Sequence, residues 1–169
     1  MDVIREIESY LLWLTAMEEN LTRFKYAPSF CEENVWHLCR EPVFEGIELK
    51  VVFVLSHGGI CRLWNQKICG DTDEPVCWDY HAFLMALDEE WMAWDLDTKL
   101  GMPIPMGGYI ANTFRNPDDL PDLFEPVFRV LDAEEYLSTF SSDRSHMQGP
   151  GGEWMANPPP LCSSSSASW

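Results

Sequence analysis

The sequence predicts an α+β domain in which a mainly antiparallel β-sheet is flanked by helices. Apolar runs with the length of buried strands recur through the middle of the chain, and helical periodicity comes before and after them. Short turn signals rich in glycine and proline separate neighbouring runs. A chain of 169 residues is long enough for one domain with a substantial core and too short for two.

The helices are predicted from periodicity and from signals at their ends. Apolar residues at three- and four-residue steps over 2–20 predict an amphipathic helix that packs on the domain. Pro28 discourages a helix just before it, so a second helix is expected to begin near residue 31 and to run over 31–40, with acidic residues in its first turn. Shorter helices are expected over 109–114 and 133–140.

Five segments are predicted as strands. Residues 49–56 form a nearly continuous apolar run, which is typical of a buried strand, and 60–64 is expected as its hairpin partner across a Gly-Gly turn. The runs 76–87 and 91–96 are expected to form a second hairpin, and 127–131 a further strand.

We expect three parts along the chain: an N-terminal amphipathic helix over 1–22, a domain over 23–147 that carries the chemistry, and a tail over 148–169. The last part is rich in Gly, Pro and Ser, and this composition cannot bury enough apolar surface to order itself. A flexible tail is therefore the expectation.

The charge of the chain excludes several classes of partner. It has 28 acidic and 11 basic residues, which gives a formal net charge of −17 at pH 7. Nucleic acids and anionic membranes are bound by clustered Lys and Arg, so neither is an expected partner. A solvated acidic surface explains the charge, and attraction of a cationic ligand such as a peptide's free amino terminus is the functional alternative.

The six cysteines include no CxxC pair, which argues against a zinc or thioredoxin-type motif. The first residues lack the basic start and apolar run of a signal peptide. No apolar stretch approaches the ~20 residues that span a bilayer. We therefore expect a reducing compartment in which the cysteines are free thiols.

A histidine–carboxylate pair follows from counting along the second expected hairpin. Side chains alternate between the faces of a strand, so Asp79 shares a face with His81, and Asp95 shares a face with Asp97. A three-residue loop at 87–89 would place His81 directly opposite Asp95, with about 5 Å between their Cβ atoms. A two-residue loop would lose the pairing.

Cys31 is the best candidate for a nucleophile, because a helix N-terminus stabilises the thiolate, which is the reactive form. Glu32 and Glu33 oppose this effect, so a nearby imidazolium would have to outweigh them. Taken alone, a histidine–carboxylate pair on strands is more often structural than catalytic, and a buried structural cysteine is the default for any one Cys.

Four segments together resemble signature stretches of the protein N-terminal glutamine amidohydrolase family. In chain order they are CEENVW at 31–36, WDYH at 78–81, DLDT at 95–98 and SDRSHM at 142–147. The resemblance implies a papain- or transglutaminase-like thiol hydrolase. In that arrangement Cys31 is the nucleophile, His81 the base, and Asp95 the residue that orients the imidazole.

The resemblance also implies a reaction and a setting. The reaction is deamidation of an N-terminal Gln to Glu through a thioester, with release of ammonia and without a metal or cofactor. His81 would take the Cys31 proton, protonate the departing ammonia and then activate water. The expected protein is a monomer of the cytoplasm and nucleus that acts on peptides or proteins with N-terminal Gln and feeds an N-degron pathway.

Selectivity for a chain terminus requires a group that binds the free amine. Carboxylates are its natural partners, and Asp79, Glu32 and Glu33 are the candidates because they lie close to the catalytic residues in sequence. Helix capping or surface solvation explains each of them equally well. Arg144 of the last motif has no assigned role.

Two other interpretations of the motifs are open. The same three residues would serve a broader thiol hydrolase, such as a peptidase. A truncated or inactive relative would instead bind peptide N-termini without releasing ammonia. The family usually continues past its proline run with another folded segment, whereas here the prolines at 158–160 lead to a Ser-rich stretch.

Overall fold

The computed structural model describes residues 24–70, 73–115, 121–142 and 144–159, so the helix predicted over 1–22 lies outside the described residues. The α-helices are α2 (Cys31–Leu38), α3 (Met106–Thr113) and α4 (Ala133–Thr139). The strands are β1 (Glu48–Ser56), β2 (Cys61–Leu63), β3 (Val76–Trp78), β4 (His81–Leu87), β5 (Trp91–Trp94), β6 (Ile104–Pro105) and β7 (Pro126–Asp132). Short 3-10 turns lie at Pro42–Phe44, Lys67–Cys69, Asp122–Phe124 and Ser145–Met147.

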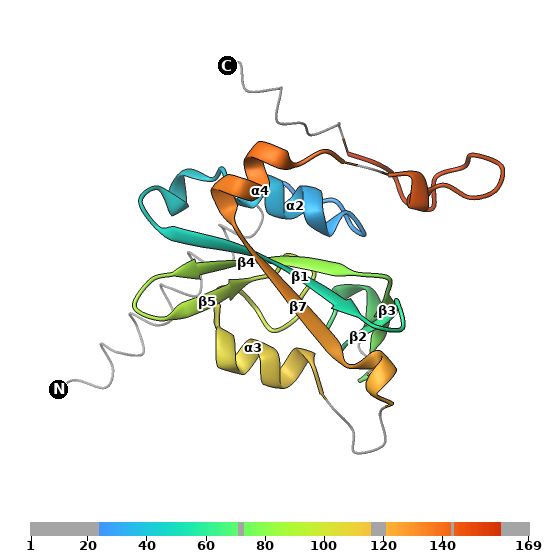
Figure 1. Cartoon of the computed structure of the whole chain (residues 1–169), viewed down its shortest axis with the longest axis horizontal. Coiled ribbons are helices and arrows are strands. Elements are labelled where there is room, and N and C mark those ends of the chain that lie inside the picture. Colours follow the sequence, from blue (N-terminus) through green and yellow to red (C-terminus); the bar gives the residue numbers. More distant parts are fainter. Residues whose placement is uncertain (1–23, 71–72, 116–120, 143, 160–169) are drawn as a thin grey trace.

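Five strands form the main sheet in the order β6-β5-β4-β1-β7, and every neighbouring pair in it is antiparallel. Strands β2 and β3 pair separately as a two-stranded sheet. Helices α2 and α4 lie over one face of the main sheet and α3 lies over the other (Figure 1). This architecture confirms the predicted α+β class.

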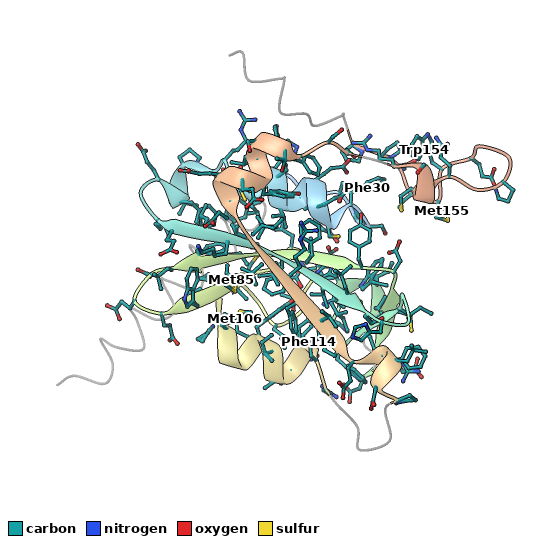
Figure 2. All side chains as sticks on the ribbon, in the orientation of Figure 1. Phe30, Met85, Met106, Phe114, Trp154 and Met155 are labelled. Atoms are coloured by element: carbon teal, nitrogen blue, oxygen red, sulfur yellow. The ribbon has the colours of Figure 1, made fainter. Side chains whose placement is uncertain are left out.

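The main sheet is buried on both faces, because successive residues of its central strands belong to two different apolar clusters. In β1, Val51 packs in the cluster that includes residues of α2 and α4, whereas Val52 packs in the cluster on the α3 side. Figure 2 shows Met85, Met106 and Phe114 in this second layer. Burial on both faces explains why β1 is a continuous apolar run instead of an alternating one.

The structure corrects two of the predicted strand pairings. Residues 60–64 are not the partner of β1, which pairs along seven residues with each of β4 and β7. A nine-residue strand buried on both faces needs long neighbours, which the three-residue β2 cannot supply. The run 76–87 is also not one strand. The chain turns after β3, where the carboxylate of Asp79 accepts a hydrogen bond from the N–H of Tyr80, and β4 enters the other sheet.

The β4–β5 hairpin has a loop of odd length, as predicted, but the loop is 88–90 and not 87–89. Leu87 pairs with Trp91, so continuation of this register places Asp97, and not Asp95, opposite His81. The displacement is by two residues, and an even displacement leaves every side chain on its predicted face. Asp95 therefore still lies on the same face as His81, in the diagonal position two residues before the residue directly opposite.

The segment that follows α4 returns along the Phe30 end of α2, where Figure 2 labels Trp154 and Met155. A backbone hydrogen bond of 3.0 Å from the N–H of Met155 to the carbonyl of Met147 closes its loop. The proposed division of the chain at 147/148 stays a prediction. None of the described helices is long and apolar enough to cross a membrane.

Candidate active site

A cavity of about 260 Å³ opens where the N-terminal end of α2 meets the start of β4. Its walls come from four stretches of the chain: Ser29 and Cys31; residues 77–81; Asp97; and Met147, Met155 and Ala156. Pockets for drug-sized ligands usually measure ~300–1,000 Å³, so this volume suits one side chain and its attached backbone.

Cys31 is the first residue of α2, and the loop before it is held in place by the side chain of Asn34. That buried amide accepts a hydrogen bond from the N–H of Ala27 at 2.8 Å and donates one to the carbonyl of Ala27 at 2.9 Å. The chain bends sharply between these residues, with Ser29 at a φ of 69°. The result is a half-buried thiol at a fixed position on the cavity wall.

His81 and Asp95 form a buried pair next to this thiol. Nε2 of His81 lies 3.1 Å from Oδ1 of Asp95, and the two residues are 1% and 2% exposed. The imidazole is also hydrogen bonded to the thiol of Cys31, which receives a further hydrogen bond from the backbone of Ala82. Since Nε2 faces Asp95, Nδ1 is the ring nitrogen available to the sulfur.

The carboxylate of Asp95 is fixed from two sides. Its Oδ2 accepts a hydrogen bond of 2.8 Å from the hydroxyl of Tyr109, a fully buried residue of α3. Its Oδ1 accepts the N–H of Asp97 at 3.0 Å. These contacts hold the carboxylate just beyond the end of β5, where it meets the imidazole.

The charges of this group depend on one another. Burial by itself would raise the pKa of Asp95, but His81 and the hydrogen bonds to the carboxylate lower it overall. Burial opposes the charged form of His81, yet Asp95 and Cys31 raise its pKa well above the usual value. The pKa of Cys31 is raised by burial and by the charge of Asp97, against the lowering effect of His81. The resting site therefore favours an imidazolium–carboxylate pair beside a neutral thiol.

The three carboxylates predicted to bind an amine lie in different surroundings. Asp79 lines the cavity and is exposed, and its Oδ1 accepts the N–H of Tyr80 at 2.9 Å. Glu32 is hydrogen bonded to the side chain of Tyr80 and is not a lining residue. Glu33 is not a lining residue either. Amine binding by any of the three stays a prediction.

Glu33 instead forms a buried ion pair with Arg144 of the last motif. Nε of Arg144 lies 2.6 Å from Oε1 of Glu33, and the hydroxyl of Ser142 donates to the same oxygen. Nη1 of Arg144 donates to the carbonyl of Pro159 at 2.7 Å. Arg144 thus links α2 to both ends of the segment that supplies the cavity with Met147 and Met155.

Several cavity features were not predicted from the sequence. Asp97 lines the cavity, although only its shared face with Asp95 was anticipated. Trp78 places a buried indole N–H in this region that donates to no group among the described residues. Its ring stacks on that of His81, with centroids 6.5 Å apart. A helix was expected near Tyr109, but its contact with Asp95 depends on how α3 packs against the sheet, and no local sequence pattern predicts that packing.

His81, Asp95 and Asp97 also offer metal-ligand atoms that lie within 4.8 Å of one another. In the described residues the imidazole and the Asp95 carboxylate use these atoms for their contact with each other and with Tyr109. Contacts within the protein therefore account for the positions of both groups.

Comparisons with known proteins bear on this site. The family model described as N-terminal glutamine amidase matches residues 26–167. A protein of Arabidopsis thaliana named protein N-terminal glutamine amidohydrolase is 36% identical over 149 residues, which cover 82% of this chain and 67% of the relative. Proteins of the same name from Drosophila mojavensis and Drosophila willistoni are 41% identical over 140 residues, which cover 79% of this chain and 68% of each relative.

Proposed function

The chain belongs to the N-terminal glutamine amidase family, and on this premise we propose that it deamidates the N-terminal glutamine of peptides and proteins to glutamate. The observation that carries the proposal is the contact of Cys31 with His81 on the wall of one small cavity, together with the contact of His81 with the buried Asp95. A thiol, an imidazole and a carboxylate linked in this order are the groups that acyl transfer from an amide requires.

The first step in this account is attack of the Cys31 sulfur on the side-chain carboxamide carbon of the substrate. In the reacting form one proton is shared between Cys31 and His81, and the negative charge of Asp95 favours its position on the imidazole. The carbon–sulfur bond forms as the carbonyl electrons move to oxygen. Asp95 and Tyr109 keep the imidazole oriented throughout.

The oxyanion that forms needs hydrogen-bond donors on the cavity wall. The indole N–H of Trp78 is the proposed donor, because it is buried beside His81 and has no acceptor in the described residues. An unsatisfied buried donor costs about 1–3 kcal/mol, which a substrate oxygen would offset. The N–H groups of the first turn of α2 are unpaired within the helix and can contribute as well.

Collapse of this intermediate releases ammonia. His81 gives its proton to the departing nitrogen, the carbon–nitrogen bond breaks, and a thioester to Cys31 remains. Neutral His81 then accepts a proton from water as the water attacks the thioester carbon. The products are the glutamate side chain and the free thiol, so the site returns to its starting state.

The geometry supports hydrolysis over the two rival functions. A passive binding module has no use for a buried His81–Asp95 pair in contact with a thiol, because burying charges carries a desolvation cost. A broad peptidase needs an extended cleft for several residues, whereas this cavity measures about 260 Å³. One terminal side chain matches that volume.

Turnover of defined peptides tests the proposal. A fresh Gln-starting peptide would be incubated with the full chain, and ammonia release and a gain of one mass unit would be followed. Matched peptides would start with Asn or with acetylated Gln, or would carry Gln internally, and Cys31→Ala would be the control variant. We expect conversion of the free N-terminal Gln peptide alone, abolished in the variant. Peptide binding without ammonia release would instead identify a binding module.

The product carries a carboxylate where the substrate carried a neutral amide. We propose that an N-degron pathway reads this acidic terminus and selects the protein for degradation. The half-life of a Gln-starting reporter in cells that depend on this chain tests the idea, and an equal half-life with Cys31→Ala would contradict it. A monomeric state and a location in cytoplasm and nucleus stay predictions.

A further inference from the structure

Asp97 is a buried carboxylate on the wall of the proposed catalytic cavity. It is 7% exposed, and the hydroxyl of Tyr26 donates to its Oδ1 at 2.6 Å. That is the single hydrogen bond to its carboxylate among the described residues, so Oδ2 has no protein donor there. The proposed mechanism gives this group no part.

The carboxylate also lacks a direct counter-ion. In the described part of the chain no Lys or Arg side chain lies within ion-pair distance of it, and none lines the cavity. Lys67 is the nearby cation, but its Nζ donates to the carbonyl of Leu96 at 2.7 Å. The titratable groups that face Asp97 are Tyr26, Cys31, Lys67, His81, Asp95 and Tyr109. Burial and the charge of Asp95 raise the pKa of Asp97, against the lowering effects of His81, Tyr26 and Lys67. The charged carboxylate is therefore costly at this position, and a bound cation would offset that cost.

We propose that Asp97 binds the free α-ammonium group of the substrate's N-terminal residue. The inference rests on the proposed function, because it takes the carboxamide carbon to lie at the Cys31 sulfur. In glutamine the α-nitrogen and that carbon are four bonds apart, or about 5 Å when extended. Asp97 and Cys31 line the same cavity, and a carboxylate oxygen of Asp97 lies within 4.8 Å of a ring nitrogen of His81, so one glutamine can reach both groups.

The same span explains discrimination by length. Asparagine has one bond fewer between its amine and its carboxamide carbon, so it cannot engage Asp97 and Cys31 together. An internal or acetylated glutamine has no ammonium group to offer a buried carboxylate. A single contact with Asp97 would therefore make the site selective both for the length of the side chain and for a free terminal amine.

The other carboxylates are less suited to this role. Asp79 is exposed, and its Oδ1 already accepts a hydrogen bond from the N–H of Tyr80. Water therefore screens the charge of Asp79 and competes with an amine for its carboxylate. Glu33 is committed to Arg144, and Glu32 contacts Tyr80 outside the cavity lining. Asp97 alone combines burial, a free oxygen and a place on the wall.

Binding of the amine also has a consequence for the nucleophile. The negative charge of Asp97 raises the pKa of Cys31 in the free protein. An ammonium group next to Asp97 offsets that charge, so the thiol loses its proton more readily once a substrate with a free amine is bound. Selectivity and activation of the thiol then come from the same ion pair.

The test compares Asp97→Asn with the unaltered chain and with Asp88→Asn, which removes the same charge from an exposed loop. kcat/KM would be measured on a Gln-starting peptide. The dissociation constants of this peptide and of its acetylated counterpart, which is not expected to turn over, would be measured in a Cys31→Ala background. We expect Asp97→Asn to lose about tenfold to a hundredfold in kcat/KM and in affinity for the free-amine peptide, and nothing in affinity for the acetylated one. Alkylation of Cys31 by iodoacetamide without substrate should become faster at neutral pH, and its pH midpoint should move down.

The opposite directions of these two effects separate amine binding from loss of structure. An unchanged ratio between the dissociation constants of the two peptides in Asp97→Asn, with the unaltered chain active, would overturn this assignment and leave the proposed function intact. Should Asp97→Asn not melt cooperatively, Asp97→Glu carries the comparison, and its kept charge predicts a kept preference for the free amine. Loss of that preference in Asp97→Glu would equally overturn the assignment. Inactivity of the unaltered chain on all peptides would contradict the proposed function itself.

Discussion

Nε2 of His81 and Oδ1 of Asp95 lie 3.1 Å apart, and both residues are almost completely buried. The contact joins a strand of the main sheet to the turn after its neighbour, and α3 supports it through Tyr109. The raised pKa of His81 and the lowered pKa of Asp95 both follow from their mutual attraction. The pair holds the imidazole in one orientation and keeps a proton on it for the leaving group.

Replacement of Asp95 by Asn tests the electrostatic part of this contact. The amide keeps the size of the side chain but removes the charge that holds the proton on His81. We expect kcat for a Gln-starting peptide to fall by on the order of 10²–10⁴, as in other triads that lose their carboxylate. Steady-state ammonia release measures this, and a kcat within threefold of the unaltered chain would show that the carboxylate is not needed.

Tyr109→Phe tests whether α3 helps to position Asp95. The change removes one hydrogen bond to a charged group and leaves the aromatic packing on Phe83 in place. We expect kcat to fall about tenfold with little change in KM, because a hydrogen bond to a charge contributes about 1.5–3 kcal/mol. A rise in KM at constant kcat would indicate a role in substrate binding instead.

The raised pKa of Cys31 predicts the pH dependence of its reactivity in the absence of substrate. A raised pKa means that more of the side chain is thiol at a given pH, and the thiolate alone is alkylated. The alkylation rate of Cys31, followed by mass spectrometry, should therefore climb from neutral pH to beyond pH ~8.5, the ordinary pKa of cysteine. A rate that is constant between about pH 5 and 8 would reveal a preformed thiolate and contradict the resting state described above.

The Glu33–Arg144 pair is expected to hold the last segment against α2. Glu33→Gln removes the carboxylate that pairs with Arg144, whose side chain is 9% exposed, and loss of one partner of a buried pair costs about 3–5 kcal/mol. The free energy of unfolding in urea measures this, with the exposed Glu45→Gln as a control expected within about 0.5 kcal/mol. A double variant, Glu33→Gln with Arg144→Met, should be less destabilised than the sum of its parts. Additive losses would show that the two side chains do not interact.

Much of the fold could be predicted from the sequence, because its elements carry local signals. The strand at 49–56 and the helix that begins at residue 31 follow from apolar runs and from the break at Pro28. Strand partners were harder to predict, since β1 pairs with β4 and β7, which both come later in the chain and are not its neighbours in sequence. Burial of β1 on both faces also leaves no alternation of apolar and polar residues from which a partner could be matched. The hairpin register was wrong by two residues because the loop begins one residue later than expected.

The candidate site was predictable as far as its motifs extend. Cys31, His81 and Asp95 were identified from motif resemblance and strand alternation, and the structure brings them together. Which carboxylates line the cavity depends on contacts between residues that are far apart in sequence. Glu33 is turned away from the cavity by Arg144, which is 111 residues distant in sequence, and Asp97 is turned toward it by a register that local pattern does not fix. Tertiary packing determines which carboxylates face the cavity, and no short sequence segment encodes that packing.

The most direct test of the central claim is detection of the thioester on Cys31 during turnover. The full chain would be mixed with a Gln-starting peptide, quenched in acid within the first turnovers, and measured by intact-mass spectrometry with peptide mapping. We expect an adduct on Cys31 equal to the peptide mass less one ammonia, which disappears after hydroxylamine treatment and is absent from Cys31→Ser. Ammonia release that continues in Cys31→Ser, or an adduct on another residue, would contradict the assignment of Cys31 as the nucleophile.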